Sequence, residues 1–160
     1  MKVLFATSIK SWGGGEEWML SACRGMKERG HAVTLAARPG SAIAARAIRQ
    51  GISCMEVPFR HDLDADSFWR VYRFCAKEHP DLLCVNMDRV LRVAGSAARA
   101  AGVRCVIHCA ESPQGTANTA RADNRTNRAG WHRMPDSLPC LNAELIRRSW
   151  GAHGAAVQTS

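Results

Sequence analysis

The strongest constraint on the fold is an alternation of strand-like and helix-like segments that runs from the first residues to His108. Short apolar runs alternate with segments whose apolar residues recur at helical spacing. Three predicted helices end at a glycine that is followed by a strand, at Gly30, Gly51 and Gly102. Alternation of this kind with apolar strands is typical of a parallel sheet covered by helices on both faces.

The expected strands are Lys2–Thr7, Ala32–Ala37, Ile52–Val57, Asp81–Asn86 and Val103–His108. The expected helices are Glu16–Arg29, Ser41–Gln50, Ala65–Lys77 and a fourth that starts at Asp88 or Arg89 and ends before Gly102. We expect Asp64 or Asp66 to cap the third helix, whose predicted buried side is Phe68, Val71, Tyr72 and Cys75. Right-handed crossovers then favour an α/β, Rossmann-like, doubly wound parallel sheet in the order 3-2-1-4-5.

After His108 this pattern stops. Between Cys109 and Ser160 the only Leu, Ile, Val or Phe residues are Leu138, Leu141, Leu145, Ile146 and Val157. We expect one short helix near Leu141–Trp150 and disorder elsewhere, because such a segment buries too little apolar surface. The expected organisation is one domain over 1–108 and a poorly ordered C-terminal tail over 109–160. The abruptness of the change favours loss of the reading frame near His108 or Cys109, with a genuine disordered tail as the alternative.

Composition narrows the class of protein. The formal net charge of +8 favours phosphate-rich partners or an anionic membrane surface, although solubility explains it equally well. No stretch packs basic residues with stacking aromatics in the way that a nucleic-acid-binding module does, so we expect no nucleic-acid partner. The chain has neither a long apolar run nor a signal peptide, which predicts a cytoplasmic location. The seven cysteines form no metal-binding motif, and we expect reduced thiols and no metal site.

The junction between the first strand and the first helix is the best candidate for a binding site. Gly13, Gly14 and Gly15 lead into the helix, whose N-terminus can hold an anion such as a phosphate. The glycines do not form a dinucleotide fingerprint, because Trp18 stands where the third glycine belongs. An NADP-dependent enzyme is therefore a third-ranked hypothesis, and the absence of a GK[ST] motif excludes a nucleotide-triphosphate P-loop. A flexible turn without a ligand is the alternative explanation.

The order of the segments resembles a known family. The KVLF start and glycine loop are followed by MKERGHAVTLAARPGS, GISCMEVPF, HPDLLCVNMDRV and a fifth strand that ends in His108. From Met1 to His108 this order resembles the N-terminal half of a GT-B glycosyltransferase of family 4, with a subfamily-4-like N-terminal domain. The resemblance implies two Rossmann-like domains that face a cleft, with the acceptor bound by the N-terminal domain and the nucleotide-sugar donor by the C-terminal domain. It also implies retention of anomeric configuration, a nucleotide-sugar co-substrate and no metal or other cofactor.

The resemblance assigns roles to particular residues. It places the three glycines and Glu16 against the donor diphosphate and the acceptor, and it makes His108 the catalytic residue near the reacting sugar. Asn86, at the end of the fourth strand, would face the same cleft. Each residue also has a structural explanation, since His108 can be an ordinary residue at a strand end and Asn86 can cap the fourth helix. Glu16 can simply complement the helix dipole.

These observations predict an N-terminal fragment of a retaining glycosyltransferase that is inactive alone, because nothing after His108 supplies the donor-binding half. The complete enzyme would transfer a sugar from a nucleotide-sugar donor to a cell-envelope glycan or lipid acceptor, for example in lipopolysaccharide synthesis. The alternative is a stand-alone Rossmann-like binding module that works with a separate partner chain. The third helix carries Arg70, Arg73 and Lys77 beside aromatic residues, which allows peripheral contact with the anionic inner face of a membrane. A solvated outer face is the alternative for that helix.

Overall fold

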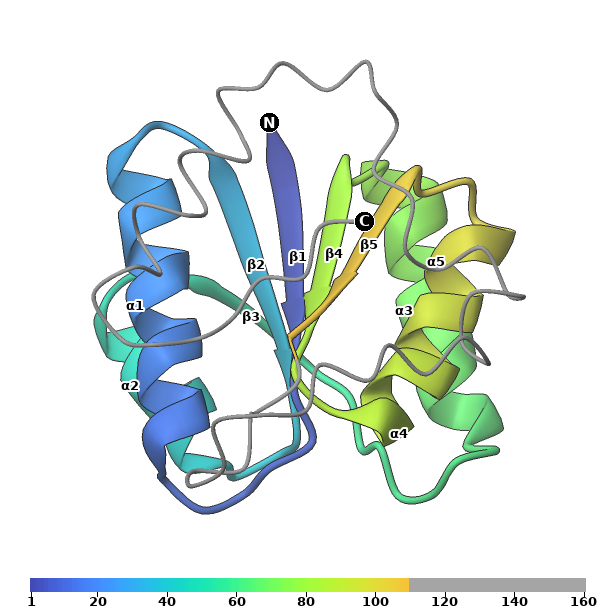
Figure 1. The fold of residues 1–160 in the computed structure, drawn as a ribbon, viewed down its shortest axis with the longest axis horizontal. Helices are drawn as coiled ribbons and strands as arrows, with labels where there is room; N and C mark the ends of the chain where they lie inside the picture. Colours follow the sequence, from blue (N-terminus) through green and yellow to red (C-terminus); the bar gives the residue numbers. More distant parts are fainter. Residues whose placement is uncertain (110–160) are drawn as a thin grey trace, which may run out of the picture.

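The computed structural model describes residues 1–109, which form a five-stranded parallel sheet between two layers of helices (Figure 1). The strands are β1 (Lys2–Ala6), β2 (Ala32–Ala37), β3 (Ser53–Glu56), β4 (Leu82–Val85) and β5 (Cys105–His108). Their spatial order is β3-β2-β1-β4-β5, and every pairing is parallel. The predicted fold class and strand order are therefore confirmed.

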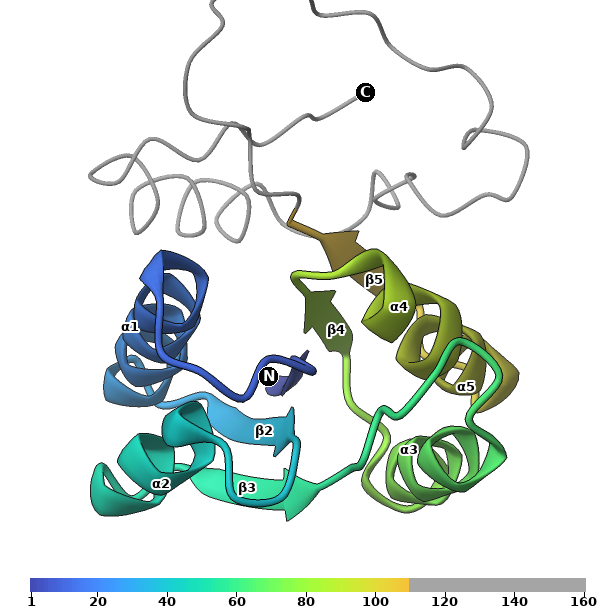
Figure 2. The ribbon, with the colours of Figure 1, turned by 90° about the horizontal axis from the view of Figure 1, so that it is seen from below.

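The helices divide between the two faces of the sheet, as Figure 2 shows from below. Helices α1 (Gly14–Glu28) and α2 (Ala42–Arg49) cover one face, where Met19 and Cys23 of α1 belong to the same core as Phe5 of β1. Helix α3 (Ala65–Glu78) and the helical segment 88–100 cover the other face, where Val71 lies in one core with Leu4. Successive strand residues thus point into opposite cores, as a sheet buried on both faces requires.

Helix α1 begins two residues earlier than expected. Gly14 and Gly15 are its first helical residues, and only Gly13 stays outside as the extended N-cap. Glycine is a poor helix former, but the buried stripe of Met19, Cys23 and Met26 fixes the helix against the sheet. The helix therefore extends back through the two glycines, and the glycine-rich loop is shorter than predicted.

The fourth predicted helix is not uniform. It consists of α4 (Asp88–Val90), a wider π-helical turn η1 (Leu91–Gly95) and α5 (Ser96–Ala100). It is followed by Gly102, whose φ of 83° is in the left-handed region that favours glycine. Val103, expected in the fifth strand, instead donates its N–H to the carbonyl of Ala98 and so closes the helix end. The strand therefore starts only at Cys105.

Other predictions concern the helix ends, the membrane and the C-terminal segment. Gly30 and Gly51 have φ values of 81° and 67°, which confirms them as left-handed residues at helix ends. Within residues 1–109, no helix is both long enough and apolar enough to cross a bilayer. The expected helix near Leu141–Trp150 and the disorder expected beyond residue 109 lie outside the described residues.

Candidate functional site

The candidate site lies at the carboxyl ends of β1 and β4, where the strand order changes direction. From β1 the chain proceeds outwards to β2 and β3, whereas β4 lies on the other side of β1 and leads to β5. Ligands of open α/β sheets bind at such a switch point. The loops after the two strands touch each other here, because the Ser8 hydroxyl donates a hydrogen bond to the Met87 sulfur at 3.2 Å.

The glycine junction places the N-terminus of α1 at this edge. Gly13 has an extended backbone and provides no side-chain cap, so the first N–H groups of the helix find no side-chain acceptor on the residue that precedes the helix. A Cβ atom added at Gly14 would meet nothing within 4 Å. The helix dipole makes this N-terminus a favourable position for an anion.

The loop between β1 and α1 is anchored on α2. Its Lys10 carbonyl accepts the Ala42 N–H at 3.1 Å. The Arg46 guanidinium lies over the Trp12 ring, 3.6 Å from the ring centre, which is a cation–π contact. These two contacts hold the residue before Gly13 in place. Sequence patterns do not indicate these contacts, because they join segments that are about thirty residues apart.

The other two long helices have side-chain caps. Ser41 accepts the Ala44 N–H at the start of α2. At the start of α3 the buried Asp64 carboxylate accepts the Arg60 N–H at 2.8 Å, and the Ser67 hydroxyl at 2.7 Å. Burial alone would raise the pKa of the Asp64 carboxyl, but the hydrogen bonds from Arg60 and Ser67 outweigh burial and lower it. Asp64, rather than Asp66, is thus the cap of α3.

Asn86 follows β4 and carries a buried amide. The residue is 8% exposed, and neither its Nδ2 nor its Oδ1 has a hydrogen-bond partner among the described residues. The N-cap of α4 is Met87, and no side chain caps this helix, so Asn86 does not have the capping role that was its structural alternative. An unpaired buried amide is unfavourable by about 1–3 kcal/mol. Such a group is a candidate for pairing with a ligand.

His108 ends β5 and lies opposite Val85 in the parallel register. Its side chain is 16% exposed, and its Nε2 is 3.4 Å from Oδ1 of Asp88, which is at the start of α4. Val106, two residues earlier, packs into the core under α3 and α5, so alternation directs His108 to that same face. No sequence pattern identifies Asp88 as a partner of His108, because only the strand register brings the two residues together.

The predicted site residues therefore share one edge of the sheet but not one face. The glycine junction and Glu16 belong to α1, which covers one face, and His108 points towards the other. Glu16 is 3% exposed, and a Cβ at Gly13 would be 3.3 Å from its Oε2. Asn86 follows β4, which lies between β1 and β5. A ligand that lies across the carboxyl ends of the strands can therefore contact groups from both faces of the sheet.

The loop between β3 and α3 contributes two ion pairs, both made by Asp62. Oδ1 of Asp62 is 3.3 Å from Nε of Arg89, and Oδ2 is 2.7 Å from Nη2 of Arg92. Asp62 therefore ties this loop to the helical segment 88–100.

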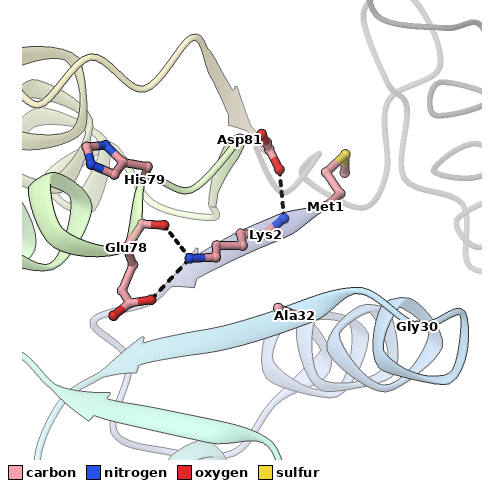
Figure 3. Close-up of a pocket in the computed structure, with 7 residues that line it drawn as sticks. All are labelled: Met1, Lys2, Gly30, Ala32, Glu78, His79 and Asp81. Atoms are coloured by element: carbon pink, nitrogen blue, oxygen red, sulfur yellow. Dashed lines mark hydrogen bonds and ion pairs between the residues drawn. The ribbon is translucent and has the colours of Figure 1, made fainter.

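The amino edge of the sheet has a hollow of about 460 Å³, shown in Figure 3. The Lys2 ammonium there donates to the backbone carbonyl of Glu78 at 2.8 Å and to the Glu78 carboxylate at 3.3 Å. The backbone N–H of Lys2 donates to the Asp81 carboxylate at 2.7 Å. These charged groups satisfy one another. The hollow lies at the end of the sheet away from the candidate site. Within residues 1–109, no three His, Cys, Asp or Glu side chains are grouped so that they could hold a metal ion.

Residues 13–155 match a family model described as the glycosyl transferase 4-like domain. The matched range continues past His108, so the resemblance extends further along the chain than we expected from the sequence. No curated protein matches the sequence of this chain.

Several solved structures share the fold. HepE from Anabaena, in complex with UDP, superposes with a TM-score of 0.55 at 19% identity, over 68% of this chain and 29% of HepE. MurG from Acinetobacter baumannii superposes with a TM-score of 0.60 at 14% identity, over 86% of this chain and 42% of MurG. The glycosyltransferase VinC, in complex with dTDP, gives 0.56 at 16% identity, over 99% of this chain and 46% of VinC. The chain thus spans less than half of each of these proteins.

Proposed function

This chain belongs to the glycosyl transferase 4-like family, and on that premise we propose that it is the acceptor-side domain of a retaining glycosyltransferase. The proposed reaction moves a sugar from a nucleotide-sugar donor to a cell-envelope glycan or lipid acceptor. The observation that carries the proposal is the uncapped N-terminus of α1 at the switch point between β1 and β4. Structures with this fold hold UDP, UDP-glucose or dTDP, which supports a nucleotide-sugar as the partner.

In this proposal the N-terminus of α1 approaches the donor diphosphate. The N–H groups of Gly14 and Gly15 donate to phosphate oxygens, and the absence of side chains lets the phosphate come close. Glu16, in the same helical turn, accepts a hydrogen bond from an acceptor hydroxyl. Negative charge on the departing diphosphate is stabilised by donors that are already in position.

Asn86 and His108 complete the proposed site. The Asn86 amide offers one donor group and one acceptor group, which matches a sugar hydroxyl, and a ligand there would relieve the unfavourable state of the unpaired amide. His108 is the proposed catalytic residue beside the reacting sugar. Asp88 contacts its Nε2 and so limits the orientation of the imidazole ring.

We further propose that these 160 residues alone give little or no sugar transfer. Transfer requires donor and acceptor to be fixed in one geometry inside a closed cleft. The related structures, of which this chain covers less than half, are long enough to supply a second wall. Robust transfer to an acceptor by the purified chain, without any other polypeptide, would overturn this part of the proposal.

Gly14→Ala tests the donor-site assignment. The new Cβ meets nothing within 4 Å, so the free energy of unfolding should not fall. Affinity for UDP-glucose, measured by NMR titration, should weaken about tenfold, because the methyl group occupies the space where a phosphate approaches. Gly25→Ala, on the same helix and away from its N-terminus, is the matched control and should bind as the unaltered chain does. Equal binding by both variants would refute the assignment.

The outer face of α3 is the proposed membrane contact, consistent with a lipid-linked acceptor. Trp69 is 56% exposed and stacks on Tyr72 with ring centres 5.4 Å apart. Arg73 and Lys77 lie on the same helix, whereas Arg70 is paired with Asp66. Cosedimentation with vesicles that contain anionic lipid, but not with neutral vesicles, is the expected result. Trp69→Ala should weaken it, and equal binding to both kinds of vesicle would contradict the proposed contact.

A further inference from the structure

Two cysteines lie next to the candidate site without being part of it. Cys84 is in β4, two residues before Asn86, and Cys109 directly follows His108. Their sulfur atoms are 3.6 Å apart and within hydrogen-bonding distance. The Cys109 N–H also donates to the Val85 carbonyl at 2.8 Å, which keeps Cys109 against β4 beyond the last strand pair.

Among the described cysteines, Cys109 combines partial exposure with contact to a second thiol, and the cysteines outside this pair do not combine the two properties. Cys23, Cys75 and Cys105 are buried, and burial raises the pKa of each thiol. Cys54 is partly buried, but its sulfur lies 3.6 Å from the Ile52 carbonyl, and burial raises its pKa as well. Cys109 is partly exposed and also touches a second thiol.

We propose that Cys84 and Cys109 form a redox modification site, at which a hydroperoxide such as hydrogen peroxide converts the two thiols into a disulfide. In the first step the Cys109 sulfur, as thiolate, attacks one peroxide oxygen. An S–O bond forms, the O–O bond breaks and the departing hydroxide takes up a proton to leave as water. Cys109 is then a sulfenic acid.

In the second step the Cys84 sulfur attacks the Cys109 sulfur. The S–S bond forms, the S–O bond breaks, and the Cys84 proton leaves with the hydroxyl group as a second water. Overall the two thiols lose two electrons and two protons, and the peroxide is reduced to two waters. The two sulfurs must approach from 3.6 Å to about 2.0 Å, which draws the chain after His108 towards β4.

The environment of Cys84 sets the order of the two steps. The hydrogen bond with Cys109, together with complete burial, raises the pKa of the Cys84 thiol well above its usual range. A protonated, enclosed thiol is a poor first nucleophile but can attack a neighbouring sulfenic acid once that has formed. The second step is therefore slow, and the Cys109 sulfenic acid should be trapped by dimedone when dimedone is present during oxidation.

The test is peroxide treatment of the full 160-residue chain, followed by digestion under non-reducing conditions and mass spectrometry. Trypsin leaves Cys84 in one peptide and Cys105 with Cys109 in another, and fragmentation between the latter two distinguishes them. The expected product is a Cys84–Cys109 link that has lost two hydrogen atoms and is reversed by dithiothreitol. A Cys109 that stays reduced, or one that links to any other cysteine or to a second chain, would overturn the proposal.

Variants sharpen the result. Cys109→Ser should abolish the link, and Cys84→Ala should leave the Cys109 sulfenic acid to accumulate and raise dimedone labelling several-fold. Cys105→Ala is the matched control, since it removes a neighbouring buried thiol of β5 and should leave the link intact. If Cys105→Ala lost the link while its circular dichroism spectrum stayed unchanged, the disulfide would depend on Cys105, and the proposed pairing of Cys84 with Cys109 would be wrong.

Discussion

Two helix N-termini at the same edge of the sheet are built in opposite ways. Helix α3 starts at Asp64, whose buried carboxylate accepts hydrogen bonds from Arg60 and from both the backbone and the hydroxyl of Ser67. Helix α1 starts at Gly13, which has no side chain to offer. Both helices follow a strand and begin at its carboxyl end. The N-cap residue of α3 therefore supplies a carboxylate acceptor, whereas the N-cap residue of α1 supplies none and the acidic side chains of α1, Glu16 and Glu17, lie within its first turn.

The side-chain cap of α3 serves stability, whereas the N-terminus of α1, in our proposal, is arranged for binding. A side-chain cap stabilises a helix by about 0.5–2 kcal/mol relative to alanine but by only a few tenths of a kcal/mol relative to glycine, so the glycine at the start of α1 has a small cost. The nearby Asn86 amide likewise has no partner in the described part of the chain. At the amino edge, in contrast, Lys2, Glu78 and Asp81 satisfy one another. The groups without partners thus gather at the edge where ligands of this fold class bind.

Removal of the cap of α3 should have the largest effect. Asp64→Ala leaves the Arg60 N–H and the Ser67 hydroxyl without their acceptor, and we expect the free energy of unfolding to fall by about 2–4 kcal/mol. Urea denaturation followed by circular dichroism measures this change. Asp66→Ala, two residues further along the chain in an exposed ion pair with Arg70, is the control and should have a much smaller effect. If the two variants lost similar amounts of unfolding free energy, Asp64 would not be the stabilising cap of α3.

The pH dependence of stability follows from the same carboxylate. The pKa of Asp64 is lowered from its ordinary value of 3.8 in the folded chain, so folding favours the ionised form. Its contribution is complete above the pKa of the unfolded chain and is lost as the pH falls through the lower folded value. We expect the free energy of unfolding to decrease below about pH 4. Asp64→Asn should flatten that decrease, and an unchanged slope would show that other carboxylates cause it.

Asn86→Leu should raise stability while it harms binding. Leucine has the branched outline of asparagine, although its methyl groups are bulkier, and it removes the buried amide that has no partner among the described residues, so we expect the free energy of unfolding to rise by about 1 kcal/mol. Affinity for UDP-glucose or for an acceptor sugar should fall in the same variant. Thermal and urea denaturation measure the first effect and NMR titration the second. A destabilised variant with normal binding would mean that the amide has a structural role.

A change at the amino edge should have the smallest effect. Lys2→Gln removes an ion pair whose side chains are 52% and 38% exposed, and exposed pairs contribute about 0.5 kcal/mol or less. Nucleotide binding should be unchanged, because this edge is at the far end of the strands. If Lys2→Gln lost as much binding as Gly14→Ala, the assignment of nucleotide binding to the carboxyl edge of the sheet would be wrong.

Sequence patterns predicted the fold well because its determinants are local. Apolar runs and helix-ending glycines depend on neighbours in the chain, so β2 is observed with the predicted bounds and Gly30, Gly51 and Gly102 have the expected conformation. The choice between Asp64 and Asp66 as cap could not be made from residue type alone, because it depends on which carboxylate reaches the Arg60 N–H and the Ser67 hydroxyl. The wider turn at Leu91–Gly95 gave no sequence signal.

The candidate site was predicted only in outline. Position after a strand is enough to place Asn86 and His108 at the carboxyl edge, and this is observed. The contacts of His108 with Asp88, of Trp12 with Arg46 and of Cys84 with Cys109 depend on strand register and on packing between distant segments. The burial of Asn86 without a partner depends on the same long-range packing, and residue type alone does not indicate it.

The most direct test of the central claim is an NMR titration of the isotope-labelled chain with UDP-glucose, repeated on Gly13→Ser. The serine hydroxyl would give α1 a cap of its own, as Asp64 does for α3, and its Cβ would require the Glu16 carboxylate, 3.3 Å away, to shift slightly, so the net change in stability should be within a few tenths of a kcal/mol. We predict that chemical-shift changes in the unaltered chain centre on Gly13, Gly14 and Gly15, and that they largely disappear in Gly13→Ser. Changes centred on the amino edge, or changes that the serine leaves unaffected, would contradict the account.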